Sequence, residues 1–176
     1  MDLMMVIGEP GIGKSTLVEE LTRDLPFEET ASPFHFRRYD CGVTELGIRR
    51  PDFPGTDAYP MNIQPKIISY LSAVRPKLVL LEGDRMANPK FLGWMRDVLG
   101  YALFIYMLHG YDVAEQRRAS RGHEFDPVWL KGRQSKVETL GYVWNAIPLD
   151  ASLGLRELVE LIDNPVAAAL KEAVPV

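Results

Sequence analysis

An eight-residue segment near the amino terminus constrains this chain more than any other. The pattern G-x-x-x-x-G-K-[ST] is matched at every fixed position by Gly8-Glu9-Pro10-Gly11-Ile12-Gly13-Lys14-Ser15. The apolar run 3–7 before it predicts a buried parallel strand, and residues 17–25 carry leucine and valine at helical spacing. A glycine-rich turn between a strand and a helix directs backbone N–H groups and the helix dipole toward an anion. The segment therefore predicts a site for the phosphates of a nucleotide.

Residues 8–15, termed the phosphate loop below, have separate expected roles. We expect Lys14 to reach the outer phosphates and to act in catalysis, and the hydroxyl of Ser15 to be a ligand of Mg²⁺. The remaining nucleotide-binding residues are expected to be Gly8, Gly11, Ile12, Gly13 and Thr16. The alternative is a glycine-rich turn before an ordinary helix, and by residue usage a chain of this length matches the pattern by chance on the order of 1% of the time.

Composition favours a single cytoplasmic domain spanning residues 1–176. The chain is 47% hydrophobic and 25% charged, which allows a sizeable core. Cys41 is the one cysteine, so no intramolecular disulfide can form, and no apolar stretch has the length needed to cross a bilayer. The net charge is −4, yet residues 31–140 hold 16 Lys and Arg against 12 Asp and Glu. An anionic partner is therefore expected near the middle of the chain.

The remaining pattern alternates strands and helices. Further strands are expected at residues 34–39, 78–81, 103–108 and 142–149, with helices at 63–74, 91–99, 112–122 and, after residue 150, near the end of the chain. This alternation is typical of βαβ units. It predicts the α/β class, with a mostly parallel five-stranded sheet between two layers of helices.

Charged residues follow the expected strand 78–81. Glu82 and Asp84 are two residues apart, so they project to the same side if the backbone stays extended. The carboxyl end of a strand in an open parallel sheet faces the ligand crevice. We therefore expect Glu82 to hold the Mg²⁺ water shell, with Asp84 and Arg85 as catalytic residues. The alternative is a surface turn with an Asp–Arg ion pair.

Four features in chain order carry a resemblance: the phosphate loop, the strand ending in Glu82-Gly83-Asp84-Arg85, an arginine-rich segment, and a last strand leading into Leu149-Asp150-Ala151-Ser152. Together they resemble the P-loop nucleoside and nucleotide kinases, thymidylate kinase among them. The resemblance implies the three-layer P-loop kinase fold, with ATP and Mg²⁺. It also implies that residues 112–136, termed the lid, cover the nucleotide, with Arg117 and Arg121 on ATP and Arg133 on the acceptor. A basic, solvated helix face is the alternative for any single arginine.

A loop at residues 41–60, termed the acceptor loop, departs from the thymidylate kinase pattern. It is rich in proline and glycine and carries Arg49, Arg50, Asp52 and Asp57, which we expect to bind the phosphoryl acceptor. Asp40, at the end of the expected strand 34–39, is a candidate base for the acceptor hydroxyl. The alternative is a rigid connector whose charges pair locally.

Residues 47–57, 82–85 and 131–136 together look like those of bacteriophage-type P-loop kinases, a group that includes enzymes acting on 5-hydroxymethyluracil within DNA. That resemblance implies a base hydroxymethyl group in DNA as the acceptor, and the host cytoplasm as the location if the chain is phage-encoded. A free nucleoside or nucleotide is the alternative acceptor, and a nucleotide-dependent switch ATPase is a further alternative. The sequence does not fix the oligomeric state, and a homodimer is compatible with it.

Replacing Lys14 with alanine tests the phosphate loop. We expect Lys14→Ala to keep the fold and to lose most phosphoryl transfer, because the positive charge over the outer phosphates is gone. Transfer of label from ATP in the presence of Mg²⁺ measures the loss, and circular dichroism checks the fold. Turnover equal to that of the parent would contradict the assignment.

Overall fold

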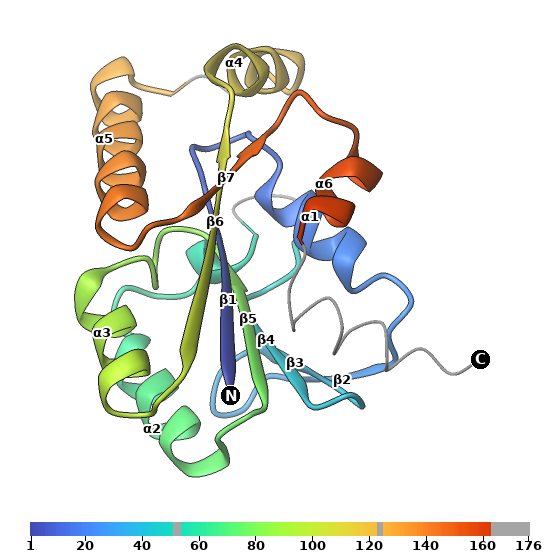
Figure 1. The fold of residues 1–176 in the computed structure, drawn as a ribbon, viewed down its shortest axis with the longest axis vertical. Coiled ribbons are helices and arrows are strands. Elements are labelled where there is room, and N and C mark those ends of the chain that lie inside the picture. Colours follow the sequence, from blue (N-terminus) through green and yellow to red (C-terminus); the bar gives the residue numbers. More distant parts are fainter. Residues whose placement is uncertain (51–53, 123–124, 163–176) are drawn as a thin grey trace.

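The computed structural model describes residues 1–50, 54–122 and 125–162. Within these ranges a seven-stranded sheet has the order β2-β3-β4-β5-β1-β6-β7 (Figure 1). The strands are β1 (Asp2–Ile7), β2 (Phe27–Thr30), β3 (Phe36–Tyr39), β4 (Val43–Leu46), β5 (Leu78–Glu82), β6 (Ala102–His109) and β7 (Ile147–Asp150). The five strands β4, β5, β1, β6 and β7 are parallel, whereas β2 and β3 extend the sheet as an antiparallel edge.

Helices cover both faces of the sheet. The helices are α1 (Lys14–Leu21), the short 3₁₀ helix η1 (Thr56–Ala58), α2 (Gln64–Val74), α3 (Pro89–Asp97), α4 (Tyr111–Ser120), α5 (Pro127–Val143) and α6 (Leu155–Leu161). Buried side chains of α2, α3 and α5 form a core on one face, and those of α1, α4 and α6 join a core on the other. In Figure 1, α2, α3 and α5 lie on one side of the sheet and α1 and α6 on the other. The expected three-layer α/β/α fold is confirmed, although the described sheet has seven strands and not the expected five.

The central strands are buried because both of their faces are covered. Residues 3–7 of β1 are all fully buried, and so are residues 79–81 of β5. A parallel strand covered on both faces reads as a continuous apolar run rather than an alternating one. This explains why the sequence pattern identified both strands.

Several elements differ from those expected. Residues 43–46, at the start of the acceptor loop, form the parallel strand β4, which contains the buried polar residues Thr44 and Glu45. The expected strand 34–39 is instead the antiparallel β3. Helix α5 continues to Val143, so the last strand begins at Ile147 and not at residue 142. Short or polar strands lack the apolar run on which the prediction depended.

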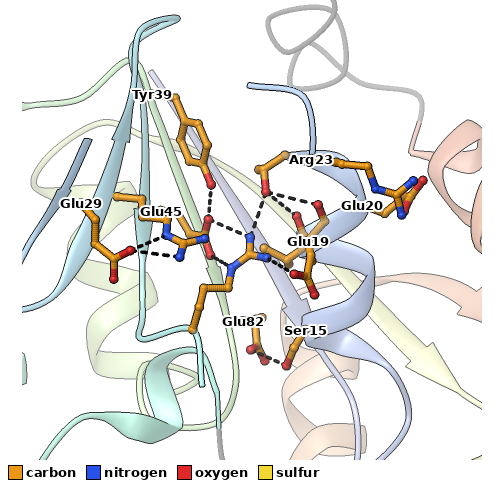
Figure 2. Close-up of polar contacts among 12 residues, drawn as sticks. Ser15, Glu19, Glu20, Arg23, Glu29, Tyr39, Glu45 and Glu82 are labelled. Carbon is orange, nitrogen blue, oxygen red and sulfur yellow. Dashed lines mark hydrogen bonds and ion pairs between the residues drawn. The ribbon is translucent and has the colours of Figure 1, made fainter. Parts of the chain in front are cut away.

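A buried polar network joins β3, β4 and α1 (Figure 2). The hydroxyl of Tyr39 donates a hydrogen bond to the carboxylate of Glu45, which is 6% exposed. Arg49 donates from Nε to Glu45 Oε1 at 2.8 Å and from Nη2 to the hydroxyl of Thr22 at 2.9 Å. Burial, with a further contribution from the charge of Glu45, raises the pKa of Tyr39 to about 12. The network fixes the start of the acceptor loop against the helix that follows the phosphate loop.

Removing the carboxylate at the centre of this network tests its contribution to stability. We expect Glu45→Ala to lower the free energy of unfolding by about 2–3 kcal/mol, because it removes the buried carboxylate that accepts from both the Arg49 guanidinium and the Tyr39 phenol. Urea unfolding measures the change. Glu29→Ala, which breaks the more exposed pair with Arg37, is the matched control and should cost less than about 1 kcal/mol. Equal losses in the two variants would contradict the prediction.

Candidate active site

A cavity of about 910 Å³ brings together the phosphate loop, the turn after β5, the acceptor loop and the lid. Among the described residues its lining is strongly charged. The basic lining residues are Lys14, Arg49, Arg50, Arg85, Arg118, Arg121, Arg133 and Lys136, and the acidic ones are Glu19, Asp57, Glu82 and Asp84. Basic residues outnumber acidic ones by eight to four, so the cavity suits an anionic ligand.

The phosphate loop requires its glycines. Gly11 and Gly13 have φ angles of 84° and 111°, which L side chains rarely adopt. A Cβ at Gly13 would lie 2.8 Å from Nη1 of Arg117. The ammonium of Lys14 donates to the carbonyls of Gly8 and Glu9, each at 3.0 Å, and so lies over the loop. Ile12 packs in the core beneath, and Thr16 lines the cavity one residue after Ser15.

Ser15, in the first turn of α1, meets Glu82, the last residue of β5. The hydroxyl of Ser15 donates to Oε1 of Glu82 at 2.7 Å, and Figure 2 shows the two side chains pointing toward one another. Glu82 is only 4% exposed. Burial raises the pKa of Glu82 to about 7, although the charge of Lys14 and the bond from Ser15 act in the opposite direction. Two side-chain oxygens that could act as metal ligands, one on the last residue of the phosphate loop and one at the end of β5, therefore lie together.

The turn after β5 rests on the acceptor loop. Oδ1 of Asp57 accepts hydrogen bonds from the backbone N–H of Asp84 at 2.8 Å and of Arg85 at 3.0 Å. The guanidinium of Arg85 contacts the sulfur of Met61, and its Nε is buried without a hydrogen-bond partner in the described part of the chain. Asp84 and Arg85 are thus placed by a residue that lies 27 positions or more away in sequence.

Helix α4 lies over the phosphate loop. Arg117 donates to the carbonyl of Ile12 and, at 3.3 Å, to that of Ala151 after β7. Arg118 is 5% exposed and donates to Glu9 Oε2 at 3.0 Å and to the carbonyl of Pro10 at 2.7 Å. Arg121 lines the cavity at the end of the same helix. The first part of the lid is therefore bonded to the loop that we expect to hold phosphates.

Helix α5 connects the phosphate loop to the turn after β5. Arg133 forms an ion pair with Asp84, and Lys136 donates to the Asp84 carbonyl at 2.9 Å. Gln134, between them in sequence, donates to Glu9 at 3.2 Å. The guanidinium of Arg133 also stacks over the ring of Trp129, with 4.9 Å to the ring centroid. One helix thus contacts both elements that bear expected catalytic residues.

The expected acceptor-binding residues of the acceptor loop differ in their relation to the cavity. Arg49 lines the cavity, but its guanidinium is bonded to Glu45 and Thr22. Arg50 lines the cavity as well, whereas Asp52 lies outside the described residues.

The assignment of Asp40 as a base is wrong. Strand β3 runs antiparallel to β4, so Asp40, in the turn between them, lies at the amino-terminal edge of the parallel strands. The phosphate loop leaves β1 at the opposite edge, about the length of a strand away. A proton on an acceptor in the cavity is therefore out of reach of this exposed carboxylate.

Two buried acidic residues that support the site from outside the cavity lining, Glu9 and Glu45, were not expected from the sequence. Glu9 occupies a variable position of the phosphate-loop pattern, so the pattern gives no signal for its buried pair with Arg118. Glu45 lies in a segment expected to be loop. The roles of these two residues depend on contacts between distant elements, which the sequence pattern does not show.

Among the described helices, none is long and apolar enough to cross a membrane.

Comparisons with known proteins add to this geometry. The sequence model of a family described as P-loop Nucleotide Kinase3 matches residues 1–152. No curated protein sequence matches the chain.

Solved structures share the fold. A gluconokinase from Sinorhizobium meliloti 1021 has a TM-score of 0.54 at 16% identity, covering 98% of this chain and 93% of that one. A deoxyadenosine kinase from M. mycoides with bound dATP has a TM-score of 0.51 at 14% identity, covering 93% and 98%. A sugar kinase from Janibacter sp. HTCC2649 has a TM-score of 0.51 at 16% identity, covering 99% and 96%. At these identities the likeness shows the fold alone.

The raised pKa of Glu82 predicts a pH dependence of stability. Between the ordinary pKa of 4.5 and the folded value of about 7, the folded chain keeps a proton that the unfolded chain has lost. Stability therefore falls as pH rises through this window. Between pH 5 and pH 8, we expect the parent to lose about 2–3 kcal/mol more unfolding free energy than Glu82→Gln, measured without divalent cations. Parallel stability curves for the two proteins would contradict this.

Proposed function

The chain belongs to the P-loop nucleotide kinase3 family and is a phosphotransferase, and from this premise we propose that it moves the γ-phosphoryl group of ATP to a hydroxyl of a nucleobase or nucleoside. The preferred acceptor in this proposal is the hydroxymethyl group of 5-hydroxymethyluracil in DNA. A free nucleoside or nucleotide, as in thymidylate kinases, is the alternative acceptor.

One observation carries the proposal: the phosphate loop, the Asp84-Arg85 turn and the acceptor loop line the same cavity. In the proposed reaction the bond from the γ-phosphorus to its bridging oxygen breaks while the acceptor oxygen bonds to that phosphorus. ADP leaves, and the hydroxyl proton passes to a base or to solvent. Lys14 and Arg85 counter the charge of the transferring group, and Asp84 orients the acceptor hydroxyl.

Ser15 and Glu82 fit a magnesium ion. Mg²⁺ prefers oxygen ligands and is bound in such sites through one or two carboxylates together with substrate phosphates. The Ser15 hydroxyl and the Glu82 carboxylate are 2.7 Å apart, and burial already disfavours the ionised form of Glu82. A nearby divalent cation would offset that cost. We assign these two residues to hold the ion, which when bound neutralises charge on the phosphates.

The charge of the cavity supports an acceptor that itself carries phosphate. Arg50 and Arg85 line the side formed by the acceptor loop and the turn after β5. Guanidinium groups bind phosphate oxygens through paired donors, so an acceptor that carries phosphate suits this side of the cavity better than a neutral nucleoside does. A DNA strand and a nucleotide both satisfy this requirement. DNA is preferred because residues 47–57, 82–85 and 131–136 together resemble the bacteriophage DNA-base kinases.

A transfer assay with γ-labelled ATP and Mg²⁺ separates the candidates. The acceptors are a DNA oligonucleotide with one 5-hydroxymethyluracil, the same oligonucleotide with thymine, free 5-hydroxymethyl-deoxyuridine monophosphate, and thymidylate. We expect label on the first oligonucleotide and none on the thymine control. Label on free nucleotides alone would assign the alternative, and label released only as phosphate would contradict both.

Replacing Arg50 tests the acceptor loop separately from the phosphate loop. We expect Arg50→Ala to bind ATP as the parent does, because Arg50 follows β4 and not β1. Its kcat/KM for the acceptor should fall about thirtyfold or more, as for the loss of a charged contact. Calorimetry measures ATP binding and the transfer assay measures kcat/KM. Arg38→Ala, which removes an exposed arginine of β3 that pairs with Glu28, is the control, and equal transfer by both variants would remove Arg50 from the acceptor site.

A further inference from the structure

We propose that Asp57 is a positioning residue, which sets Asp84 and Arg85 for phosphoryl transfer by bonding their backbone, and that it does so without contacting the acceptor. The proposal rests on the proposed function of the cavity. It gives Asp57 a role different from acceptor binding, which its place in the acceptor loop suggested.

Both oxygens of the Asp57 carboxylate face the turn after β5. Oδ1 accepts the two consecutive backbone N–H groups of Asp84 and Arg85, at 2.8 and 3.0 Å. The second oxygen, Oδ2, faces Gly83, where a Cβ would lie only 3.0 Å from it. Gly83 has a φ of 100°, so the turn itself needs glycine at this point. The carboxylate and the turn therefore fit together in one arrangement.

The segment that carries Asp57 is itself fixed. Thr56 is fully buried, and its hydroxyl donates to the carbonyl of Glu82 at 2.8 Å. Gly55 and Ile48 exchange two backbone hydrogen bonds, at 2.9 and 3.0 Å. A Cβ at Gly55 would lie 2.1 Å from Oε1 of Glu82. The backbone at the start of η1 therefore approaches Glu82 more closely than a residue with a Cβ could. Asp57 is thus held on a rigid support against the end of β5.

Asp84 is held from the other side by the lid. Its carboxylate pairs with Arg133 and its carbonyl accepts from Lys136, while its N–H is bonded to Asp57. These contacts fix the side chain, the carbonyl and the amide of one residue from two directions. Without Asp57 the contacts from α5 remain but the amides of Asp84 and Arg85 lose their acceptor. A shift of about 1 Å in a catalytic group can cost on the order of a hundredfold in rate.

Two substitutions at Asp57 separate geometry from charge. Asp57→Asn keeps an oxygen able to accept both N–H bonds and removes the charge, whereas Asp57→Glu keeps the charge and moves it by one methylene group. If Asp57 acts by positioning, the asparagine variant should retain kcat within about threefold and the glutamate variant should lose about tenfold or more. Asp57→Ala should lose at least as much as the glutamate variant. In all three, ATP affinity and the KM for the acceptor should stay close to the parent.

The measurements use the full chain at a fixed pH of 8. Transfer to the 5-hydroxymethyluracil oligonucleotide gives kcat and KM, or transfer to thymidylate if the parent labels that acceptor instead. Asp97→Ala is the matched control, because Asp97 pairs with Arg96 on the surface of α3. It should behave as the parent.

Amide exchange followed by NMR gives a readout that needs no acceptor. The N–H groups of Asp84 and Arg85 should exchange about tenfold faster or more in Asp57→Ala than in the parent, and close to the parent rate in Asp57→Asn. Unchanged exchange in the alanine variant would overturn the proposal. So would a raised acceptor KM with unchanged kcat, or asparagine and alanine variants that are equally impaired, since both indicate a direct contact with the acceptor.

The role of Asp57 can still be tested if Asp57→Ala does not fold or if the parent labels no acceptor. If Asp57→Ala does not fold, as judged by circular dichroism, the contrast between the asparagine and glutamate variants still decides between geometry and charge. If the parent labels none of the acceptors, the proposed function fails, and the exchange rates of Asp84 and Arg85 still decide whether Asp57 holds the turn.

Discussion

The parallel pairing of β1 with β5 is the constraint on which the rest of the site depends. Its register places Val6 beside Glu82, so the phosphate loop and the Asp84-Arg85 turn leave the sheet next to one another. Because side chains alternate between the faces of a strand, a slip of one residue would turn Glu82 away from Ser15. The register is held by the burial of residues 3–7 and 79–81 between two layers of helices. The core of the protein and the geometry of its site are therefore fixed by the same residues.

Local patterns were enough to predict the phosphate loop and its surroundings. The loop, its strand and its helix are contiguous in sequence, and the spacing that permits phosphate binding is written in eight residues. The carboxyl end of β5 could also be placed, because the strand before it is a plain apolar run. The whole three-layer fold follows from repeating this unit. What lies close to these patterns in sequence was therefore predictable.

Pairings between distant segments were not predictable in the same way. Strand β4 is four residues long and contains two buried polar residues, Thr44 and Glu45, and the burial of the Glu45 carboxylate depends on the partners that Tyr39 and Arg49 supply. Because no apolar run marks β4, the sequence pattern does not indicate that β3 is antiparallel, and Asp40 is therefore expected at the wrong edge of the sheet. The bonds from Asp57 to the turn after β5 depend on η1 packing against Glu82, and no periodicity in the sequence reports such a contact.

The buried charges of the site also explain how the lid is organised. Glu9 and Arg118 are both nearly buried, and an ion pair in that setting has to satisfy its remaining hydrogen-bonding capacity to offset desolvation. Gln134 and the carbonyl of Pro10 do so, and in bonding to Glu9 Gln134 brings α5 to the phosphate loop. Arg133 and Lys136, on the same helix, are bonded to Asp84. Because a helix is stiff over this length, the phosphate loop and the turn after β5 are held at one separation from outside the sheet as well as within it. The separation of the phosphate loop from the turn after β5 is in this way defined twice, by the register of β1 with β5 and by the spacing of Arg133, Gln134 and Lys136 along α5.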